Sequence, residues 1–418
     1  MTTQPLSRLL PDDLLDRCRD RAPLADADNV FFAADLAELR AAGYLAAPVP
    51  VSLGGSGFDL ATLVRAQRRL AAAAPATALG MNMHLVWVQV ARFLHERGDH
   101  RLDWVLRDAV AGEVFAFGIS EAGNEAVLMD SHSTAHSCGD GDGYLVSGTK
   151  VFTTLSPVWT RLGVHARVEC GEAGAGGRAG GSSRDADRET EPQLVFGFVR
   201  REGAEVREPG AASRGLAEGA ISHPGTWNPL GMRATQSYTT ELHGVRIAEA
   251  DVAARMAPFD GSDPLILAIF SAFSLLTAAV YAGIGDRALE LATSSANRVT
   301  AGADGQETLR LDDPDIAARL TAAVLEHRAS LDTLEVLARD VDELRARDDW
   351  FLALAAARNR VTDEARGAVE VAMRIVGARA FDAGSELARL YRDVLAGLFH
   401  PSSSRALAKT VRGFLEAT

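Results

Sequence analysis

The chain has 418 residues, which is too long for one small core and predicts two or three domains. Apolar side chains make up 47% of the residues and charged side chains 24%, a balance typical of globular proteins. The formal net charge of -13 argues against a nucleic-acid partner, because a phosphate backbone requires clustered lysines and arginines. Composition and charge therefore favour a multidomain globular protein that does not bind nucleic acid.

The three cysteines, Cys18, Cys138 and Cys170, lie far apart and form neither a CxxC pair nor a cluster with histidines. We therefore expect no metal site and no disulfide framework, and we interpret the cysteines as reduced thiols. The N-terminal residues lack the long apolar segment of a signal peptide. Both observations favour a cytoplasmic location.

The most apolar stretch, residues 264–285, is long enough to cross a membrane. It lies in the middle of the chain and lacks basic flanks. We therefore interpret it as a helix buried on most sides within a bundle, and we expect no membrane partner. Hydroxyl groups interrupt the stretch at Ser271, Ser274, Thr277 and Tyr281.

Residues 1–111 are predicted to form a helical domain. Two segments, 36–45 and 61–74, place apolar residues three and four positions apart, with arginines on the opposite face. A glycine-rich turn separates these segments, and Asp59 is placed to cap the second predicted helix.

Residues 112–255 are predicted to form a middle domain with an antiparallel sheet. Short segments rich in β-branched and aromatic residues alternate with turn residues. An insert at about residues 171–191 is dominated by glycine, serine and charge, so it is predicted to be a mobile excursion between strands. The predicted strands lie within 113–121, 143–154, 161–169 and 193–201.

Residues 256–418 are predicted to form a helical bundle. One long amphipathic segment begins with a capping aspartate followed by Pro314, which is typical of a helix start. The order helix, strand, helix predicts a mainly α, α+β protein in which a groove between layers could hold a planar cofactor. The long helical segments are 311–344, 350–377 and 384–399.

Two blocks of the middle domain carry side chains suited to a planar polar ring. In Gly118–Gly123 (GISEAG), a strand ends in the hydroxyl of Ser120 and a glycine turn. In Gly148–Thr154 (GTKVFTT), Phe152 is suited to stack on a ring while Thr154 bonds the ring edge. Taken alone, each block is also typical of ordinary structure: a strand exit, and a strand with Phe152 in the core.

Two later blocks carry arginines beside small residues. Trp227–Thr235 contains a glycine turn suited to an anion or a carbonyl edge, or to a plain loop before an edge strand. Ala372–Phe381 (AMRIVGARAF) allows close backbone approach. The arginines that follow could bind phosphates, although we interpret Arg392 and Asp393 as a structural ion pair where helices pack.

The order and spacing of these blocks resemble the acyl-CoA dehydrogenase superfamily over nearly the whole chain. GISEAG is similar to the family's T-E-P-G block, GTKVFTT to G-x-K-x-W/F-I-T, and AMRIVGARAF with RLYRD to A-x-Q-x-x-GG-x-G-(Y/F) with R-x-x-RD. The resemblance implies an N-terminal helical domain, a middle antiparallel, β-barrel-like domain and a C-terminal four-helix bundle. It also implies a homodimer or homotetramer in which one subunit completes its neighbour's cofactor site.

For the cofactor, the resemblance implies FAD, with FMN as the alternative. It places Ser120 in the flavin-binding block, Phe152 against the flavin ring and Thr154 near flavin N5. Arg374 stands where the family has a glutamine that binds the neighbouring subunit's FAD, and Gly377 lies in the same glycine motif. The change to arginine, together with a missing R-x-x-F-G motif after the first long helix, keeps FMN open.

The position of the family's catalytic glutamate carries no base in this chain. Counting from Arg392, that position is Pro401, and a second family position falls at Phe273 or Ser274. The α-proton of a thioester does not leave without a positioned acceptor, so a standard desaturation lacks its main group. We therefore expect either another base or another reaction.

His400 is the candidate catalytic residue. Its spacing from Arg392 is similar to that in the superfamily's reduced-flavin monooxygenases of phenols, sulfur heterocycles and amino sugars. In those enzymes a histidine helps hold the oxygenated flavin or receives the substrate proton, roles that suit a neutral imidazole. The alternative is that His400 caps a helix end, where a cation is favoured.

Three functions remain open from the sequence. The first is an acyl-CoA dehydrogenase-like oxidoreductase that oxidises an acyl-CoA or acyl-carrier-protein thioester with a non-standard base. The second is a reduced-flavin-dependent monooxygenase that uses His400. The third is an inactive scaffold that binds an acyl thioester. An electron-transfer partner or a flavin reductase is expected for the enzymes, and no substrate-binding residue is assigned.

Overall fold

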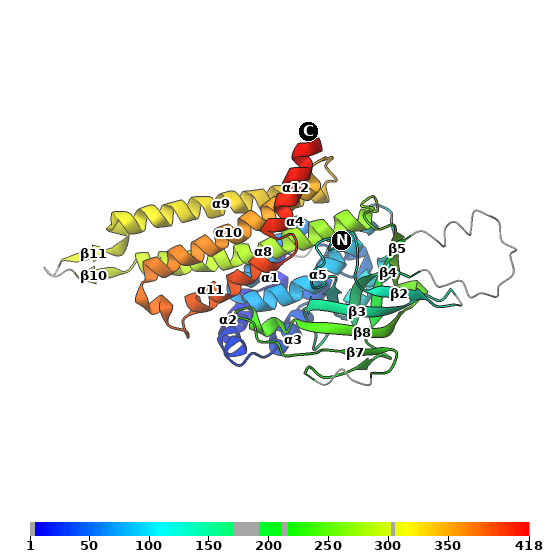
Figure 1. The fold of residues 1–418 in the computed structure, drawn as a ribbon. Coiled ribbons are helices and arrows are strands. Elements are labelled where there is room, and N and C mark those ends of the chain that lie inside the picture. The colour runs from blue at the N-terminus through cyan, green and yellow to red at the C-terminus, as the bar shows by residue number, and fades with distance from the viewer. Residues whose placement is uncertain (1–4, 140, 170–191, 211–215, 302–305, 418) are drawn as a thin grey trace, which may run out of the picture. The chain divides into compact units, whose positions relative to one another are not determined.

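The computed structural model describes residues 5–139, 141–169, 192–210, 216–301 and 306–417. Helices come first along the chain, strands follow, and helices return (Figure 1). The chain separates into two compact units, which we name the helical unit and the sheet unit. The helical unit comprises Met1–Phe93, Asn228–Thr235 and Phe270–Thr418, and the sheet unit comprises Leu94–Trp227 and Gln236–Ile269.

The order of elements agrees with the predicted helix, strand, helix sequence. The proposed domain boundaries near residues 111 and 255 stay a prediction. The predicted insert at about 171–191 and Cys170 lie outside the described residues.

The helical unit is built from helices of both chain ends. From the N-terminal part come α1 (Leu6–Leu9), α2 (Asp12–Ala27), α3 (Ala33–Ala41), α4 (Leu60–Ala73) and α5 (Pro75–His95). From the C-terminal part come α8 (Pro264–Ala296), α9 (Pro314–Asp342), α10 (Trp350–Val376), α11 (Glu386–Val394) and α12 (Ser404–Ala417). A short hairpin joins α8 to α9 and consists of β10 (Val299–Ala301) and β11 (Glu307–Leu309).

Two helix starts that the sequence predicts are confirmed. The Asp59 side chain accepts a hydrogen bond from the Thr62 amide at 2.7 Å, at the start of α4. The Asp313 side chain accepts one from the Asp315 amide at 2.8 Å, and Pro314 is the first residue of α9. Each cap satisfies an amide that the first helical turn leaves without a partner.

The predicted C-terminal bundle is confirmed, and Figure 1 shows α8, α9 and α10 lying alongside one another. Two glycines of α8 permit this close packing. A Cβ atom at Gly283 would lie 2.2 Å from the carbonyl oxygen of Arg68 in α4, and one at Gly285 would lie 2.9 Å from the ring of His327 in α9. Because real Cβ atoms do not approach so closely, the tight crossings of α8 require glycine.

Helix α8 is the apolar stretch that the sequence singled out. Among the described residues it is the one helix long and apolar enough to cross a membrane. However, 89% of its most apolar window is buried inside the protein, as predicted for a helix within a bundle.

The sheet unit contains a nine-stranded sheet with the order β6-β7-β8-β3-β2-β4-β5-β9, and β1 pairs with β4. Helix α6 (Asp103–Ala111) also belongs to this unit. The strands are β1 (Phe115–Gly118), β2 (Thr134–Ser137), β3 (Tyr144–Thr153), β4 (Arg161–Val168), β5 (Gln193–Arg200), β6 (Glu205–Val206), β7 (Ala220–Ser222), β8 (Tyr238–Ile247) and β9 (Val252–Met256).

The sheet is mixed, so the predicted antiparallel pairing holds for most of the described strand pairs but not for all. Most described pairs are antiparallel, but β1 and β2 both run parallel to β4, and β6 runs parallel to β7. The alternation of side chains predicts a strand but not the direction of its neighbour, because both ladders share the same two-residue period.

The remaining short elements are single 3-10 turns. They are η1 (Tyr44–Ala46), η2 (Val51–Leu53), η3 (Arg233–Thr235), η4 (Glu249–Asp251), η5 (Arg310–Asp312), η6 (Ala378–Phe381) and η7 (Leu395–Phe399).

Candidate functional site

Three of the sequence-predicted cofactor residues lie together in the sheet unit. The amide of Val151 in β3 donates to the Ser120 carbonyl at 2.9 Å, which joins the end of the GISEAG block to the end of GTKVFTT. The buried hydroxyl of Thr154 lies 2.7 Å from the Ser237 hydroxyl. Phe152 lies between these two contacts, near the end of β3, so the two blocks are adjacent in the structure.

Phe152 does not lie in the core, which corrects the ordinary-strand alternative. Its side chain is 58% exposed, and its ring packs edge-to-face at 6.4 Å from the ring of Trp227. The pairing of β3 with β8 shifts register between Lys150 and Thr153, and Phe152 has a φ of 56°. A bulky residue in the left-handed region is strained, and such strain is typical of functional sites.

A buried ion pair lies beneath this surface and was not assigned from the sequence. The Lys150 ammonium donates to Glu121 Oε1 at 2.6 Å, and both side chains are buried. Glu121 also accepts hydrogen bonds from the Ser133 hydroxyl at 2.6 Å and the His132 amide at 2.7 Å. Because Glu121 follows Ser120 and Lys150 lies on β3, the pair fastens the two blocks together.

The surroundings keep this pair ionised. Burial disfavours the Glu121 carboxylate, but the Lys150 charge and the surrounding donors outweigh burial and hold the pKa of Glu121 far below its usual range. Burial lowers the pKa of Lys150 to about 8, although Glu121 opposes that shift. The sequence signal was present, since each block contains one charged residue, but the pairing of these two residues was not visible.

His400 lies in the helical unit, directly after η7, and contacts α8. Its Nε2 atom is 2.6 Å from the hydroxyl oxygen of Tyr281, and its ring also lies 6.2 Å from the ring of Phe273. Burial and then the nearby Arg358 charge lower the pKa of His400 to about 3. A pKa this low corresponds to a neutral imidazole at pH 7.

The Tyr281 contact bears on which nitrogen of His400 carries the proton. Tyr281 is fully buried, and burial raises the pKa of its hydroxyl well above the usual range, so Tyr281 keeps its proton. A protonated hydroxyl can donate to Nε2 or accept from it, and donation to Nε2 corresponds to a neutral ring with its proton on Nδ1.

Two residues of α10 hold the segment that carries His400. The buried Arg358 guanidinium donates to the Gly397 carbonyl at 2.9 Å and also to the Ser402 carbonyl. The Asn359 side chain donates to the same Ser402 carbonyl at 2.8 Å. These hydrogen bonds fix the backbone on both sides of His400 and Pro401. Sequence reasoning missed Arg358 and Asn359, because nothing in the pattern of α10 marks their partners.

Comparisons with known proteins agree with this architecture. Residues 275–405 match the family model described as acyl-CoA dehydrogenase, C-terminal domain. YdbM of Bacillus subtilis, which is named a putative acyl-CoA dehydrogenase, is 25% identical over 394 residues, covering 94% of this chain and 92% of its own. The dibenzothiophene monooxygenase of Rhodococcus qingshengii is 24% identical over 422 residues, covering 94% and 89%.

A solved structure is similar over the same length. KijD3, in complex with FMN and dTDP-3-amino-2,3,6-trideoxy-4-keto-3-methyl-D-glucose, has a TM-score of 0.74 and 25% identity, covering 99% of this chain and 94% of its own. Residues 275–405 thus match the C-terminal domain of the acyl-CoA dehydrogenase family, and the chain has the fold of that superfamily. The resemblance found in the sequence is therefore confirmed, and so is the expectation of an enzyme. The similar proteins include one named a putative acyl-CoA dehydrogenase and one named a monooxygenase, so the similarity does not choose between these reactions.

Arg374 and Gly377 are the other two predicted cofactor residues, and they lie near each other in the helical unit. Both are exposed at the C-terminal end of α10. Gly377 has a φ of 82° and ends the helix, a conformation that favours glycine. Their cofactor role stays a prediction.

Arg392 and Asp393, interpreted from the sequence as a structural ion pair, each contact another residue of the helical unit. Arg392 pairs with Asp26 of α2 rather than with Asp393. The buried Asp393 side chain accepts a hydrogen bond from the Met232 amide at 2.5 Å. Both contacts bind α11 to other parts of the helical unit.

Proposed function

We propose that this protein is a reduced-flavin-dependent monooxygenase built on the acyl-CoA dehydrogenase fold. The observation that carries the proposal is the neutral His400, bonded to Tyr281, next to Pro401 at the position of the dehydrogenases' glutamate. A proline supplies no proton acceptor, so removal of a thioester α-proton lacks its base at this position. Similarity to a dibenzothiophene monooxygenase supports an oxygenating reaction.

The sheet unit offers residues that fit a flavin. Phe152 presents an exposed aromatic ring, and hydroxyl groups flank it at Ser120 and Thr154. We propose that these residues hold the flavin, as FMN or FAD, and that Arg374 and Gly377 complete the cofactor site of a neighbouring subunit. Bound in its reduced form, the flavin supplies two electrons to O2, so that one oxygen atom enters the substrate and the other leaves as water.

The proposed role of His400 is to donate a hydrogen bond rather than to act as a base. Its Nε2 atom is engaged by Tyr281, which leaves the proton on Nδ1 for an oxygen atom of a bound molecule. Because the pKa of His400 is lowered to about 3, this donor stays uncharged throughout the neutral range. Arg358 and Asn359 hold the neighbouring carbonyl groups and so preset the position of the ring.

The test combines flavin binding with two reaction assays. FMN and FAD are titrated into the protein in oxidised and reduced form, and we expect tighter binding of the reduced form. With a flavin reductase, NADH and labelled O2, a panel of phenols, sulfur heterocycles and amino-sugar nucleotides is screened for products that carry one labelled oxygen atom.

A panel of acyl thioesters provides the contrasting assay. Mixed anaerobically with the flavin-loaded protein, they should leave the flavin colour unchanged. Rapid bleaching by a thioester would overturn the proposal in favour of dehydrogenation, and failure to bind either flavin would favour the inactive scaffold.

A further inference from the structure

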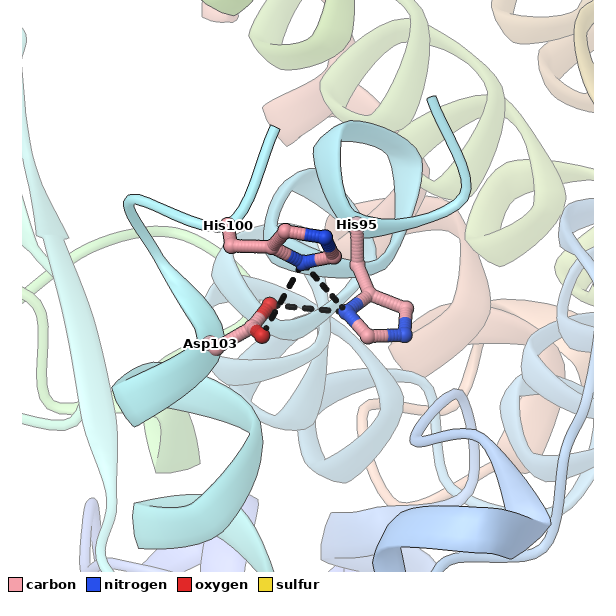
Figure 2. Close-up of side chains that lie close together, drawn as sticks. All are labelled: His95, His100 and Asp103. Carbon is pink, nitrogen blue, oxygen red and sulfur yellow. Dashed lines mark hydrogen bonds and ion pairs between the residues drawn. The ribbon is translucent and has the colours of Figure 1, made fainter. Parts of the chain in front are cut away.

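The turn between α5 and α6 brings two histidines and an aspartate together. His95 ends α5, His100 lies in the turn and Asp103 begins α6, all within the sheet unit. Figure 2 shows the two rings and the carboxylate pointing toward one another. The sequence expectation of no metal site considered cysteine pairs and cysteine-histidine clusters, and this segment contains no cysteine.

The ligand atoms have the spacing of a metal coordination shell. His95 Nδ1 lies 2.8 Å from Asp103 Oδ1, His100 Nδ1 lies 3.1 Å from Asp103 Oδ2, and the two Nδ1 atoms are 3.3 Å apart. A tetrahedral ion with bonds of about 2.0–2.1 Å separates its ligands by roughly 3.3 Å. The three atoms therefore already form one face of such a shell.

Hydrogen bonding alone explains only part of this arrangement. Two neutral histidines can each donate to the Asp103 carboxylate, which accounts for the two nitrogen–oxygen contacts. In that state both Nδ1 atoms carry protons, so their 3.3 Å separation is a contact between two donors and not a hydrogen bond, whereas loss of these protons would present two lone pairs to a bound ion. A lone pair on imidazole beside a carboxylate is the ligand arrangement that a divalent transition metal binds.

The neighbouring charges leave Asp103 available and hold the turn in shape. Arg101 lies between His100 and Asp103 in the sequence. Its two terminal nitrogens each donate a hydrogen bond to the Asp263 carboxylate at 2.9 Å. Its Nε atom donates to Asp99 at 2.7 Å. The Asp103 amide donates to the His100 carbonyl at 3.1 Å, which ties the second ligand to the third.

The cluster is open on one side. The Asp103 and His95 side chains are mostly buried, at 20% and 24% exposure, whereas the His100 side chain is 60% exposed. An ion can therefore enter from solvent, and water can complete its coordination. We propose that His95, His100 and Asp103 bind one divalent transition-metal ion, with Zn2+ as the best match to two imidazoles and one carboxylate.

The test uses the full-length protein after dialysis against a chelator, without flavin or substrate. Zn2+ is titrated in the presence of a chromophoric competitor, and we expect one ion per chain with a dissociation constant in the micromolar range or below. Co2+ should give the visible absorption of a tetrahedral or five-coordinate nitrogen and oxygen site. Bound Zn2+ should also raise the Tm of the protein, because it binds only the folded chain.

A matched pair of variants assigns the site. His100→Ala removes an exposed ligand and should weaken Zn2+ binding at least about tenfold while far-UV circular dichroism stays unchanged. His136→Ala serves as the control, because His136 is equally exposed and contacts Glu169 at 3.2 Å without a third ligand in the group. Equal Zn2+ binding by the wild type and His100→Ala, or no binding by the wild type, would overturn the proposal and leave the monooxygenase proposal untouched.

Discussion

Two histidines of the helical unit have opposite charge states, although both contact α8. His400 Nε2 lies 2.6 Å from the Tyr281 hydroxyl oxygen, and burial together with the nearby Arg358 cation lowers the pKa of His400 to about 3. His327 of α9 contacts Asp286 of α8 at 2.9 Å and Glu364 of α10 at 3.0 Å. Burial disfavours the charge there too, but hydrogen bonds to the two carboxylates outweigh it and raise the pKa of His327 to about 9.

The difference shows that burial by itself does not decide protonation. Burial disfavours the charged form of both rings, and the sign of the neighbouring charges determines the outcome. Two carboxylates make His327 a cation at neutral pH that links α8, α9 and α10. Burial and the Arg358 charge keep His400 neutral, which suits a site that must bind an uncharged or anionic oxygen.

The largest effect is expected from removing the His400 donor. His400→Ala should lower product formation at least about 100-fold on any panel compound that is oxygenated, because the Nδ1–H group is lost. His400→Asn places a side-chain N–H near the Nδ1 position and should retain part of the activity. Unchanged turnover in His400→Ala would remove His400 from the mechanism.

The pH dependence of stability separates the two histidines. The unfolded-state pKa of histidine is about 6.5, so the contribution of His327 is complete below about pH 6.5 and is lost as pH rises through about 9. The expected loss is about 3 kcal/mol of unfolding free energy, measured by urea denaturation across that window. His327→Gln should flatten this alkaline slope.

His400 should produce the opposite slope. Its lowered pKa means that the unfolded chain binds the proton more readily, so its contribution is present above about pH 6.5 and is lost as pH falls toward about 3. His400→Asn should flatten the acid slope and leave the alkaline slope intact. A wild-type protein without an alkaline slope would contradict the charged state assigned to His327.

Replacing Gly285 or Gly397 by alanine tests how tightly the chain packs around His327 and Tyr281. A Cβ atom at Gly285 would lie 2.9 Å from the His327 ring, and one at Gly397 would lie 2.9 Å from the Tyr281 ring. Each alanine variant should lose about 1–3 kcal/mol of unfolding free energy. Gly367→Ala is the control, because nothing lies within 4 Å of its Cβ position in α10, and it should be neutral or slightly stabilising.

The smallest effect is expected from Tyr281→Phe. It removes one hydroxyl and should cost about 1 kcal/mol of unfolding free energy. Its more informative readout is 15N chemical shifts of labelled histidine. The wild type should show the proton of His400 on Nδ1, whereas the variant should show a mixture of the two neutral forms. A wild-type proton on Nε2 would contradict the proposed direction of the Tyr281 hydrogen bond.

The elements themselves were predictable because local rules dictate them. The caps at Asp59 and Asp313 were confirmed, since a carboxylate before an apolar helix satisfies amides a few residues away. The burial of α8 followed from its composition. The parallel pairing of β1 and β2 with β4 was not predictable, because side-chain alternation is the same in both ladder types.

By itself, the sequence determined the superfamily, the order of helices and strands, and the blocks that contain Ser120, Phe152 and His400. Only the tertiary structure decided that Phe152 faces outward, that Glu121 pairs with Lys150, and that His400 contacts Tyr281. The reason is the distance along the chain over which each kind of interaction acts. Propensity and capping act between residues a few positions apart, whereas a pKa or a tautomer depends on groups that meet only when distant segments pack together.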